Sequence, residues 1–167
     1  MNSFSRIVEI IVTVILLFIV PVYLMGEQAG WTEQIHTMEQ LSFVVNTVSN
    51  KGVMSSQMYH QLQNNLNRNG SYYRLEVEVY HLNTQVDYYG DSYNSTSDHW
   101  EYVNTKQIEE SIEQQKGYSF YKGDYVRLTA IKQNTGLSQR IQRLLFGREL
   151  LQNAKVTYGG TIRNEAF

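Results

Sequence analysis

The sequence predicts an α+β fold, in which a long N-terminal helix is followed by a small head with a mainly antiparallel sheet. Three observations predict it: an apolar run at Ile7–Met25, helically spaced apolar residues between 35 and 66, and alternating apolar residues later in the chain. A period near 3.6 is typical of an amphipathic helix, and a period of two is typical of a half-buried strand. We therefore expect a head of about three or four strands and short helices.

The run Ile7–Met25 predicts a transmembrane helix. It is almost entirely apolar and contains one carboxylate, Glu9. As an α-helix it would be about 28 Å long, close to the thickness of a bilayer's hydrocarbon core. A cleaved secretory signal is the competing interpretation, but signal segments are usually shorter and end at a small-x-small site. The length of the run favours a retained anchor.

Flanking charge predicts the orientation of this helix. Arg6 precedes it, and no Lys or Arg occurs between Gly26 and Asn50. The positive-inside rule then places the N-terminus in the cytoplasm and the head outside. We expect a single-pass protein of the cell membrane, alone or assembled into a surface filament. The predicted parts are a cytoplasmic N-terminus (1–6), a transmembrane helix (7–25), an amphipathic helix extension (26–50) and an extracellular α+β head (51–167).

The helix is expected to continue beyond the membrane, as one helix or two nearly collinear ones from about Phe4 to Val48. Apolar residues recur at helical spacing in the extension and would form a dry face for subunit packing. Proline inside a helix kinks it, and a carboxylate inside a membrane needs the interface or a cation, such as the N-terminal amine of a neighbouring copy. The candidate assembly residues are Glu9, Pro21, Ile35, Met38, Leu41 and Val45.

The head is predicted element by element. A helix begins at Ser55 or Ser56, carries Met58, Leu62 and Leu66, and ends at 69–70. A strand follows at 72–79, a helix at 105–116, a strand at 118–132 with a turn or bulge at 122–124, a short helix around 137–145, and a last strand at 155–163. Glu76 and Glu78 are expected to face Arg127, Lys155 or Arg163 on neighbouring strands.

Residues 83–104 are polar and aromatic and predict a long loop, with room for a short hairpin. Long loops in compact domains are often functional, and tyrosine suits contact surfaces. The candidate partner-binding residues are Tyr88, Tyr89, Tyr93 and Trp100, with Arg140 and Arg143 as a second set. The oxygen-rich stretch 87–94 also permits a Ca²⁺ site, although its spacing is not that of an EF-hand. The two arginines lack the interleaved aromatic residues of a nucleic-acid surface, which disfavours nucleic acid as a partner.

Catalytic motifs are absent from the sequence. There is no cysteine, which excludes thiol chemistry and cysteine metal sites, and no HExxH, GxSxG or phosphate-binding glycine loop. The four histidines are not spaced as ligands, and His81 is expected to be an ordinary surface residue. We therefore expect no enzyme activity, no cofactor and no metal.

The layout resembles that of pilin-like proteins, which include type IV pilins, pseudopilins and TadE-like subunits. The stretches that look like single-span pilin-like proteins of Gram-positive bacteria and their mobile elements are GVMSSQMY (52–59), GSYYRLEVE (70–78), KGDYV (122–126) and VTYGGTIRNE (156–165). The resemblance implies a structural subunit of a pilus or secretion-type surface assembly, whose partners are membrane lipid, itself and other pilin-like or secretion subunits. No glycine precedes the apolar run, where type IV pilins are processed.

Two other classes of function stay open at this point. One is a single-pass, membrane-anchored extracellular domain that binds a ligand or partner through the 83–104 segment. The other is an exported enzyme, for which no constellation of residues argues.

Overall fold

The computed structural model describes residues 3–68, 71–89, 92–103, 105–114, 116–134, 140, 143–144 and 154–164; for residues 3, 83–89 and 92–100 it describes the backbone alone. The chain forms two compact units. We call Met1–Ile35 with Asn134–Asn153 the anchor unit, and His36–Gln133 with Ala154–Phe167 the head unit.

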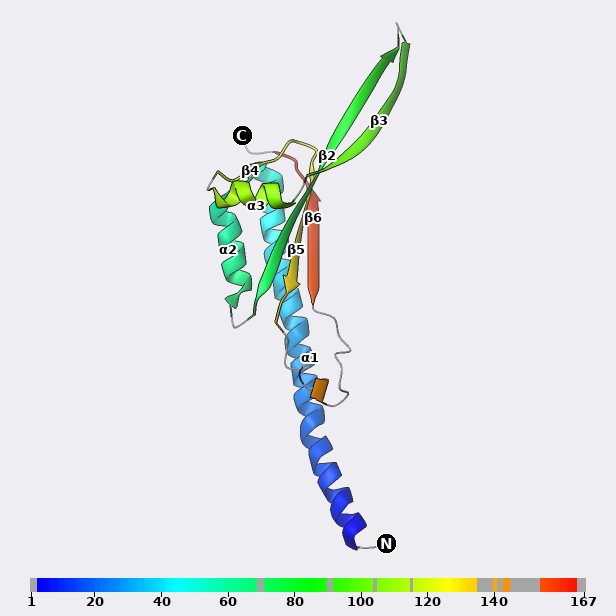
Figure 1. Cartoon of the computed structure of the whole chain (residues 1–167), viewed down its shortest axis with the longest axis vertical. Coiled ribbons are helices and arrows are strands. Elements are labelled where there is room, and N and C mark those ends of the chain that lie inside the picture. The colour runs from blue at the N-terminus through cyan, green and yellow to red at the C-terminus, as the bar shows by residue number, and fades with distance from the viewer. Residues whose placement is uncertain are drawn as a thin grey trace. The chain divides into compact units, whose positions relative to one another are not determined.

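Helix α1 (Ser3–Lys51) is one uninterrupted helix that contains Pro21 (Figure 1). Among the described residues it is the one helix long and apolar enough to cross a membrane. Its most apolar stretch has a mean hydropathy of 2.8, and none of that stretch is buried. A helix of this kind near the N-terminus is either a membrane span or a signal sequence. Gly52 ends α1 with φ of +68°, a conformation that glycine adopts without steric cost.

The head unit contains two antiparallel sheets. The larger has the strand order β3-β2-β5-β6, with β2 at Tyr73–Tyr89, β3 at Ser92–Val103, β5 at Tyr125–Lys132 and β6 at Lys155–Thr161. The smaller pairs β1 (Val53–Met54) with β4 (Tyr118–Ser119). The α+β class and the antiparallel sheet of the prediction are therefore confirmed.

Most of the segment 83–104 is strand, so the predicted long loop was wrong, whereas the hairpin for which it left room is present and is longer than expected. β2 and β3 form a hairpin whose register runs from Val79 opposite Val103 to Tyr89 opposite Ser92. β5 pairs with β2 only over Tyr73–Tyr80, so the hairpin continues past the rest of the sheet, as Figure 1 shows. The segment is polar at both alternating sets of positions, so it lacks the apolar alternation by which a half-buried strand is recognised.

Two smaller differences concern short strands. The single strand expected at 118–132 is divided into β4 and β5 by a turn, in which Gly123 has φ of +98°. β1 was not predicted because two residues are too few to show a period.

Of the predicted helix around 137–145, Arg140, Arg143 and Leu144 are helical, and its remaining residues lie outside the described part of the chain.

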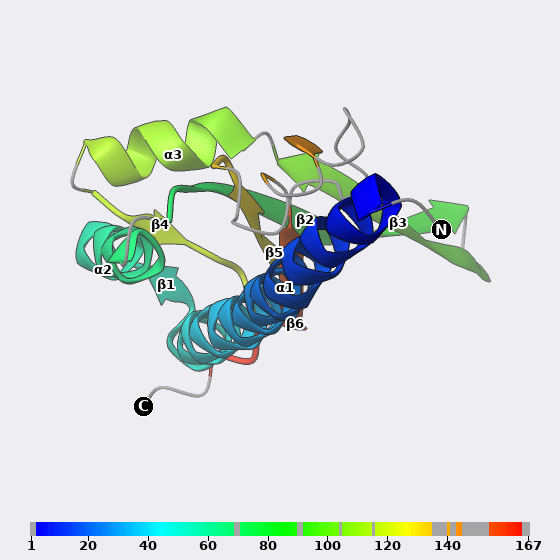
Figure 2. The ribbon, with the colours of Figure 1, turned by 90° about the horizontal axis from the view of Figure 1, so that it is seen from below.

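Helices α2 (Ser56–Leu66) and α3 (Thr105–Glu113) are confirmed close to their predicted bounds. Ser55 caps α2, since its side chain accepts a hydrogen bond from the Met58 N–H at 3.2 Å. Figure 2 shows both helices beside the short strands β1 and β4. Together with the second half of α1 they cover one face of the larger sheet. The buried core consists of Leu41, Val44, Val45 and Val48 of α1, Met54, Leu62, Leu66, Tyr73, Leu75, Val77, Val79, Ile108, Ile112, Phe120, Val126, Leu128, Ala130 and Ile162.

Residues late in the sequence hold the end of α1. The Ser49 carbonyl accepts hydrogen bonds from the N–H groups of Arg163 at 2.9 Å and Asn164 at 3.0 Å. The Ser49 hydroxyl donates to the Thr161 carbonyl at the end of β6. Carbonyls in the last turn of a helix lack partners within the helix, so these bonds satisfy groups that would otherwise need water.

Candidate functional site

The apolar segment of α1, Ile7–Met25, has almost no cover in the structure. Its large apolar side chains are mostly exposed, from 42% for Val8 to 68% for Met25. Thr13 donates its hydroxyl to the Glu9 carbonyl at 2.8 Å, so this polar group is satisfied inside the helix. A helix in lipid needs such internal satisfaction, because no water is present to provide it.

Glu9 and Pro21 both lie on this segment, and both are exposed. No described Lys, Arg or His lies within ion-pair distance of the Glu9 carboxylate. A cation for Glu9 would therefore have to come from outside the described residues, from lipid or from another subunit. The assembly role of both residues stays a prediction.

Beyond the apolar segment, α1 carries a stripe of exposed side chains that we call the α1 stripe: Leu24, Gln28, Trp31 and Ile35. The exposed fractions of Leu24, Trp31 and Ile35 are 50%, 71% and 60%. Their spacing alternates between four and three residues, which keeps them on one side of the helix and is the spacing of a helix–helix seam. The stripe thus offers a continuous surface to another helix.

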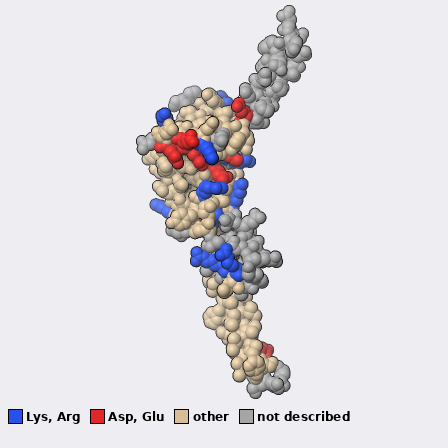
Figure 3. All heavy atoms as spheres, in the orientation of Figure 1, with Lys and Arg blue, Asp and Glu red and all other residues tan. Residues whose placement is uncertain are grey.

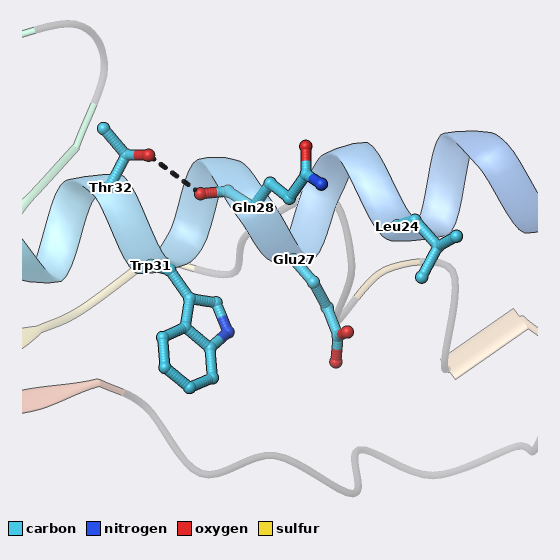
Figure 4. Close-up of a pocket in the computed structure, with 5 residues that line it drawn as sticks. All are labelled: Leu24, Glu27, Gln28, Trp31 and Thr32. Carbon is cyan, nitrogen blue, oxygen red and sulfur yellow. Dashed lines mark hydrogen bonds between the residues drawn. The ribbon is translucent and has the colours of Figure 1, made fainter.

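Figure 4 shows the neighbourhood of this stripe. A hollow of about 520 Å³ lies against α1, and its described lining residues are Leu24, Glu27, Gln28, Trp31 and Thr32. Glu27 and Trp31 extend to the same side of the helix, while Thr32 bonds back to the Gln28 carbonyl at 3.0 Å. Tyr23 donates to the Glu27 carboxylate at 3.0 Å, so the first charge after the apolar segment is held by a neighbour one turn away.

The predicted assembly residues of the helix extension divide into two groups. Leu41 and Val45 are fully buried in the head core, whereas Ile35 and Met38 are 60% and 42% exposed. Trp31 was not predicted, although it lies one turn before Ile35. Helical spacing reveals that residues share a face, but it does not tell which part of the face the head itself covers.

The predicted partner-binding residues fall in two different units. Tyr88, Tyr89 and Tyr93 lie at the far end of the β2–β3 hairpin, and Trp100 is paired with Leu82 nearer its base. Their side chains are outside the described part of the structure. Arg140 and Arg143 are exposed and belong to the anchor unit. The side chains of the stretch 87–94 proposed for Ca²⁺ likewise lie outside the described part of the structure.

An acidic patch marks the head where α3 crosses it, shown in red in Figure 3. Partial burial raises the pKa of Glu109, and the carboxylates of Glu113 and Glu76 raise it further, while Arg74 lowers it. Burial, together with Glu109 and Glu113, also raises the pKa of Tyr59 to about 12. These like charges destabilise one another, so the patch is a surface that an external cation would stabilise.

His81 was expected at the surface, but its imidazole lies against the buried carboxylate of Asp124. The distance from His81 Nδ1 to Asp124 Oδ1 is 2.8 Å, although the ring is not aligned for a hydrogen bond. Asp124 Oδ2 accepts the Tyr121 N–H at 2.8 Å, and the Asp124 carbonyl accepts the Ile162 N–H at 2.7 Å. Asp124 thus joins the base of the hairpin, the turn before β5 and the end of β6. The alternation of β2 carried the signal, because His81 follows Val77 and Val79 on the core side.

One predicted cross-strand pair is confirmed. Arg127 Nε donates to the Glu78 carboxylate at 2.5 Å, from directly opposite it in the register. Glu76 is instead bonded to Arg74 of its own strand, at 2.7 Å.

No protein-family model, curated protein or solved structure matches this chain. Among the described residues, no three His, Asp or Glu side chains gather as a metal site would require. The inference of function therefore rests on the geometry of α1 and of the head.

Proposed function

We propose that the protein is a membrane-anchored, pilin-like structural subunit that acts by helix packing and subunit association rather than by turnover. One observation carries the proposal: a single helix, α1, supplies both an unburied apolar segment of bilayer length and four residues of the head core. The anchor unit and the head unit therefore share one continuous helix.

The exposed apolar surface supports both parts of this proposal. Burial of apolar surface is the main favourable term in folding, at about 25 cal/mol per Å², so a helix exposed on every side needs a bilayer or other helices around it. Lipid tails can cover Ile7–Met25. The α1 stripe extends about 15 Å beyond Met25, since each residue adds about 1.5 Å, and reaches past the hydrocarbon core. A second helix fits the stripe better than lipid does.

The proposed setting follows from the same residues. The chain crosses the cell membrane once, with Arg6 in the cytoplasm and the head outside. Its partners are lipid, further copies of itself, and other pilin-like or secretion subunits of a pilus or related surface assembly in a Gram-positive bacterium. Glu9 pairs with a cation of a neighbouring subunit inside that assembly.

Single-cysteine cross-linking in native membranes tests the proposal directly, because the natural chain has no cysteine. Trp31→Cys places a thiol on the α1 stripe, and Ala29→Cys places a matched, exposed thiol on the opposite side of the same helix. Mild oxidation should give disulfide-linked dimers with Trp31→Cys and few with Ala29→Cys. Equal, low cross-linking of both variants at native expression would show that α1 does not pair through this face.

A second candidate function, capture of a partner by the hairpin, is favoured by the pairing of the strands. Among the described residues, β2 beyond Tyr80 is bonded only to β3, and a two-stranded ribbon is marginally stable alone. Under this alternative, replacing Tyr88, Tyr89, Tyr93 and Trp100 by alanine abolishes partner capture while the thermal unfolding of the head is unchanged. Unchanged pull-down of the partner by the quadruple variant would refute it.

A further inference from the structure

A groove of about 460 Å³ lies on the larger sheet, lined by Tyr80, Tyr125, Arg127 and Thr161. The register places Tyr80, Tyr125 and Thr161 in one row across β2, β5 and β6. This row alternates with the buried residues Val79 and Val126, so it belongs to the sheet face away from the core. We call it the sheet groove. It involves none of the residues of the α1 stripe.

The polar group of the groove is held in place before any ligand arrives. Arg127 donates from Nε to Glu78 at 2.5 Å and from a terminal nitrogen to the Tyr80 hydroxyl at 2.8 Å. The hydrogen bond to Glu78 is the main cause of a raised Arg127 pKa, which keeps the guanidinium charged. A guanidinium has five N–H donors, so this arrangement leaves donors for a ligand.

The aromatic walls are also fixed by their neighbours. The Tyr80 and Tyr125 rings are 6.3 Å apart and inclined by 52°, and Tyr102 lies 5.4 Å from Tyr80 on the other side. A Cβ on Gly159 would come within 2.3 Å of the Tyr125 hydroxyl. Only glycine at position 159 therefore lets Tyr125 lie across β6, where it forms one wall of the groove.

This combination selects the chemistry of a ligand. Glu78 and Arg127 cancel in charge, so the groove has no net attraction for a free anion or cation. Two inclined rings offer apolar surface, whereas Arg127 offers donors and the hydroxyls of Thr161 and Tyr125 offer both donors and acceptors, which sugar hydroxyl groups need. A pyranose ring has an apolar C–H face and a rim of hydroxyls, and the groove lies in the size range of small-molecule sites.

We propose that the sheet groove binds a neutral saccharide unit, with its ring against Tyr125 and Tyr80 and its hydroxyls bonded to Arg127 and Thr161. The ion pair between Glu78 and Arg127 alone does not indicate a ligand, because pairing between neighbouring strands already accounts for it. The position of Tyr125 over Gly159 covers a glycine that would otherwise weaken β6, and it also fixes the ring beside Arg127, where the ring forms a wall of the groove. The inference goes beyond subunit assembly and stands whether or not α1 pairs with another helix.

Saturation-transfer NMR on the full-length protein tests this, in micelles of a detergent without a sugar headgroup. The probes are the methyl glycosides of glucose, galactose, mannose and N-acetylglucosamine, with acetate and inorganic phosphate as anions. We expect a saturable signal in the millimolar range for at least one glycoside and none for the anions.

Three variants locate the binding. Tyr125→Ala should weaken it at least about tenfold. Gly159→Ala should weaken it several-fold with Tyr125 still present, because the new methyl group displaces the ring. Thr161→Val should also weaken binding, because it keeps the volume of the side chain but removes the hydroxyl. The hydrogen bond from Ser49 to the Thr161 carbonyl is unaffected by this change. Tyr72→Ala, which removes another exposed tyrosine of the same head, should bind like the wild type.

Several results would overturn the inference. They are the absence of a saturable signal for every glycoside, an equal loss of binding in Tyr72→Ala, or binding of acetate or phosphate in place of a sugar. Near-UV circular dichroism of each variant shows whether the head is folded, and the Thr161→Val comparison still decides if Tyr125→Ala fails to fold.

Discussion

The contact between α1 and β6 at Gly160 predicts a specific steric coupling. Gly160 is opposite the buried Val126 in the register, and a Cβ at this position would lie 3.1 Å from Val45 Cγ1. Carbon atoms are usually about 3.5–4.0 Å apart at optimal contact. Val45 is fully buried and, being β-branched in a helix, has one strongly preferred rotamer, so it cannot easily move aside. Gly160→Ala should therefore overpack this contact.

The size of the effect follows from opposing terms. Overpacking a well-packed core costs about 1–3 kcal/mol, and replacing glycine gains about 0.4–1 kcal/mol through the unfolded chain. Gly160→Ala should thus lower the free energy of unfolding by about 1–2 kcal/mol. Val45→Ala alone loses two methyl groups and leaves a cavity, for about 2–3 kcal/mol. In the double variant the new methyl occupies space that Val45 has vacated, so about 1 kcal/mol should be regained relative to the sum.

Urea unfolding of the full-length protein in micelles, followed by near-UV circular dichroism, measures the four corners of this cycle. Gly30→Ala is the control, since a Cβ there meets nothing within 4 Å and should cost no stability. Additivity of the two substitutions within about 0.5 kcal/mol would refute the steric reasoning, as would a Gly160→Ala variant as stable as the wild type.

Three further predictions concern the polar groups of the head. Asp124→Ala should lower the free energy of unfolding by about 1–3 kcal/mol, measured from the urea midpoint, because it leaves the Tyr121 N–H without its side-chain acceptor; Asp124→Asn should cost less. Glu109→Gln should raise stability by about 0.2–0.5 kcal/mol at pH 7 by removing repulsion from Glu113. The raised pKa of Glu109 means that folding favours its neutral form, so in thermal melts this gain should disappear below pH 4.5, where the wild-type carboxyl is protonated in both states. The pKa of Tyr59 is raised from 10.0 to about 12, so the wild type should lose stability as the pH rises through that window, when the unfolded phenol ionises first, and Tyr59→Phe should lose less over the same titration.

Local rules in the sequence were enough to predict much of the head. Ser55 or Ser56 was expected to begin α2, and Ser55 caps it. The alternation along 72–79 identified the first half of β2. Of the charge pairs expected between strands, the one between Glu78 and Arg127 is present. Each of these signals depends on a few residues that are close in sequence or directly paired. The long apolar helix at the start of α1 was equally predictable, because the length and composition of the run are enough to indicate it.

The features that were not predicted depend on which distant segments pack against a residue, and local sequence patterns do not contain that information. Leu41 and Val45 share a helical period with Ile35 and Met38, but only the first two are buried in the head core. The sheet groove was missed because its residues come from three strands and meet only through the register. A glycine inside a strand, as at position 159, often marks a close approach, but the sequence does not reveal which side chain approaches it.

The fastening of α1 by β6 has a consequence for how the protein is made. The Ser49 hydroxyl and the Thr161 carbonyl that it bonds are 112 positions apart in the sequence. The apolar segment of α1 is synthesised first, long before the residues that bond to the other end of this helix have been translated. Until β6 is synthesised the sheet is incomplete, and Leu41 and Val45 on the second half of α1 are not yet buried by the complete head core. Translation at about 5–20 residues per second makes this interval about 5–20 s, during which a chaperone or a neighbouring subunit has access to a surface that the finished head conceals.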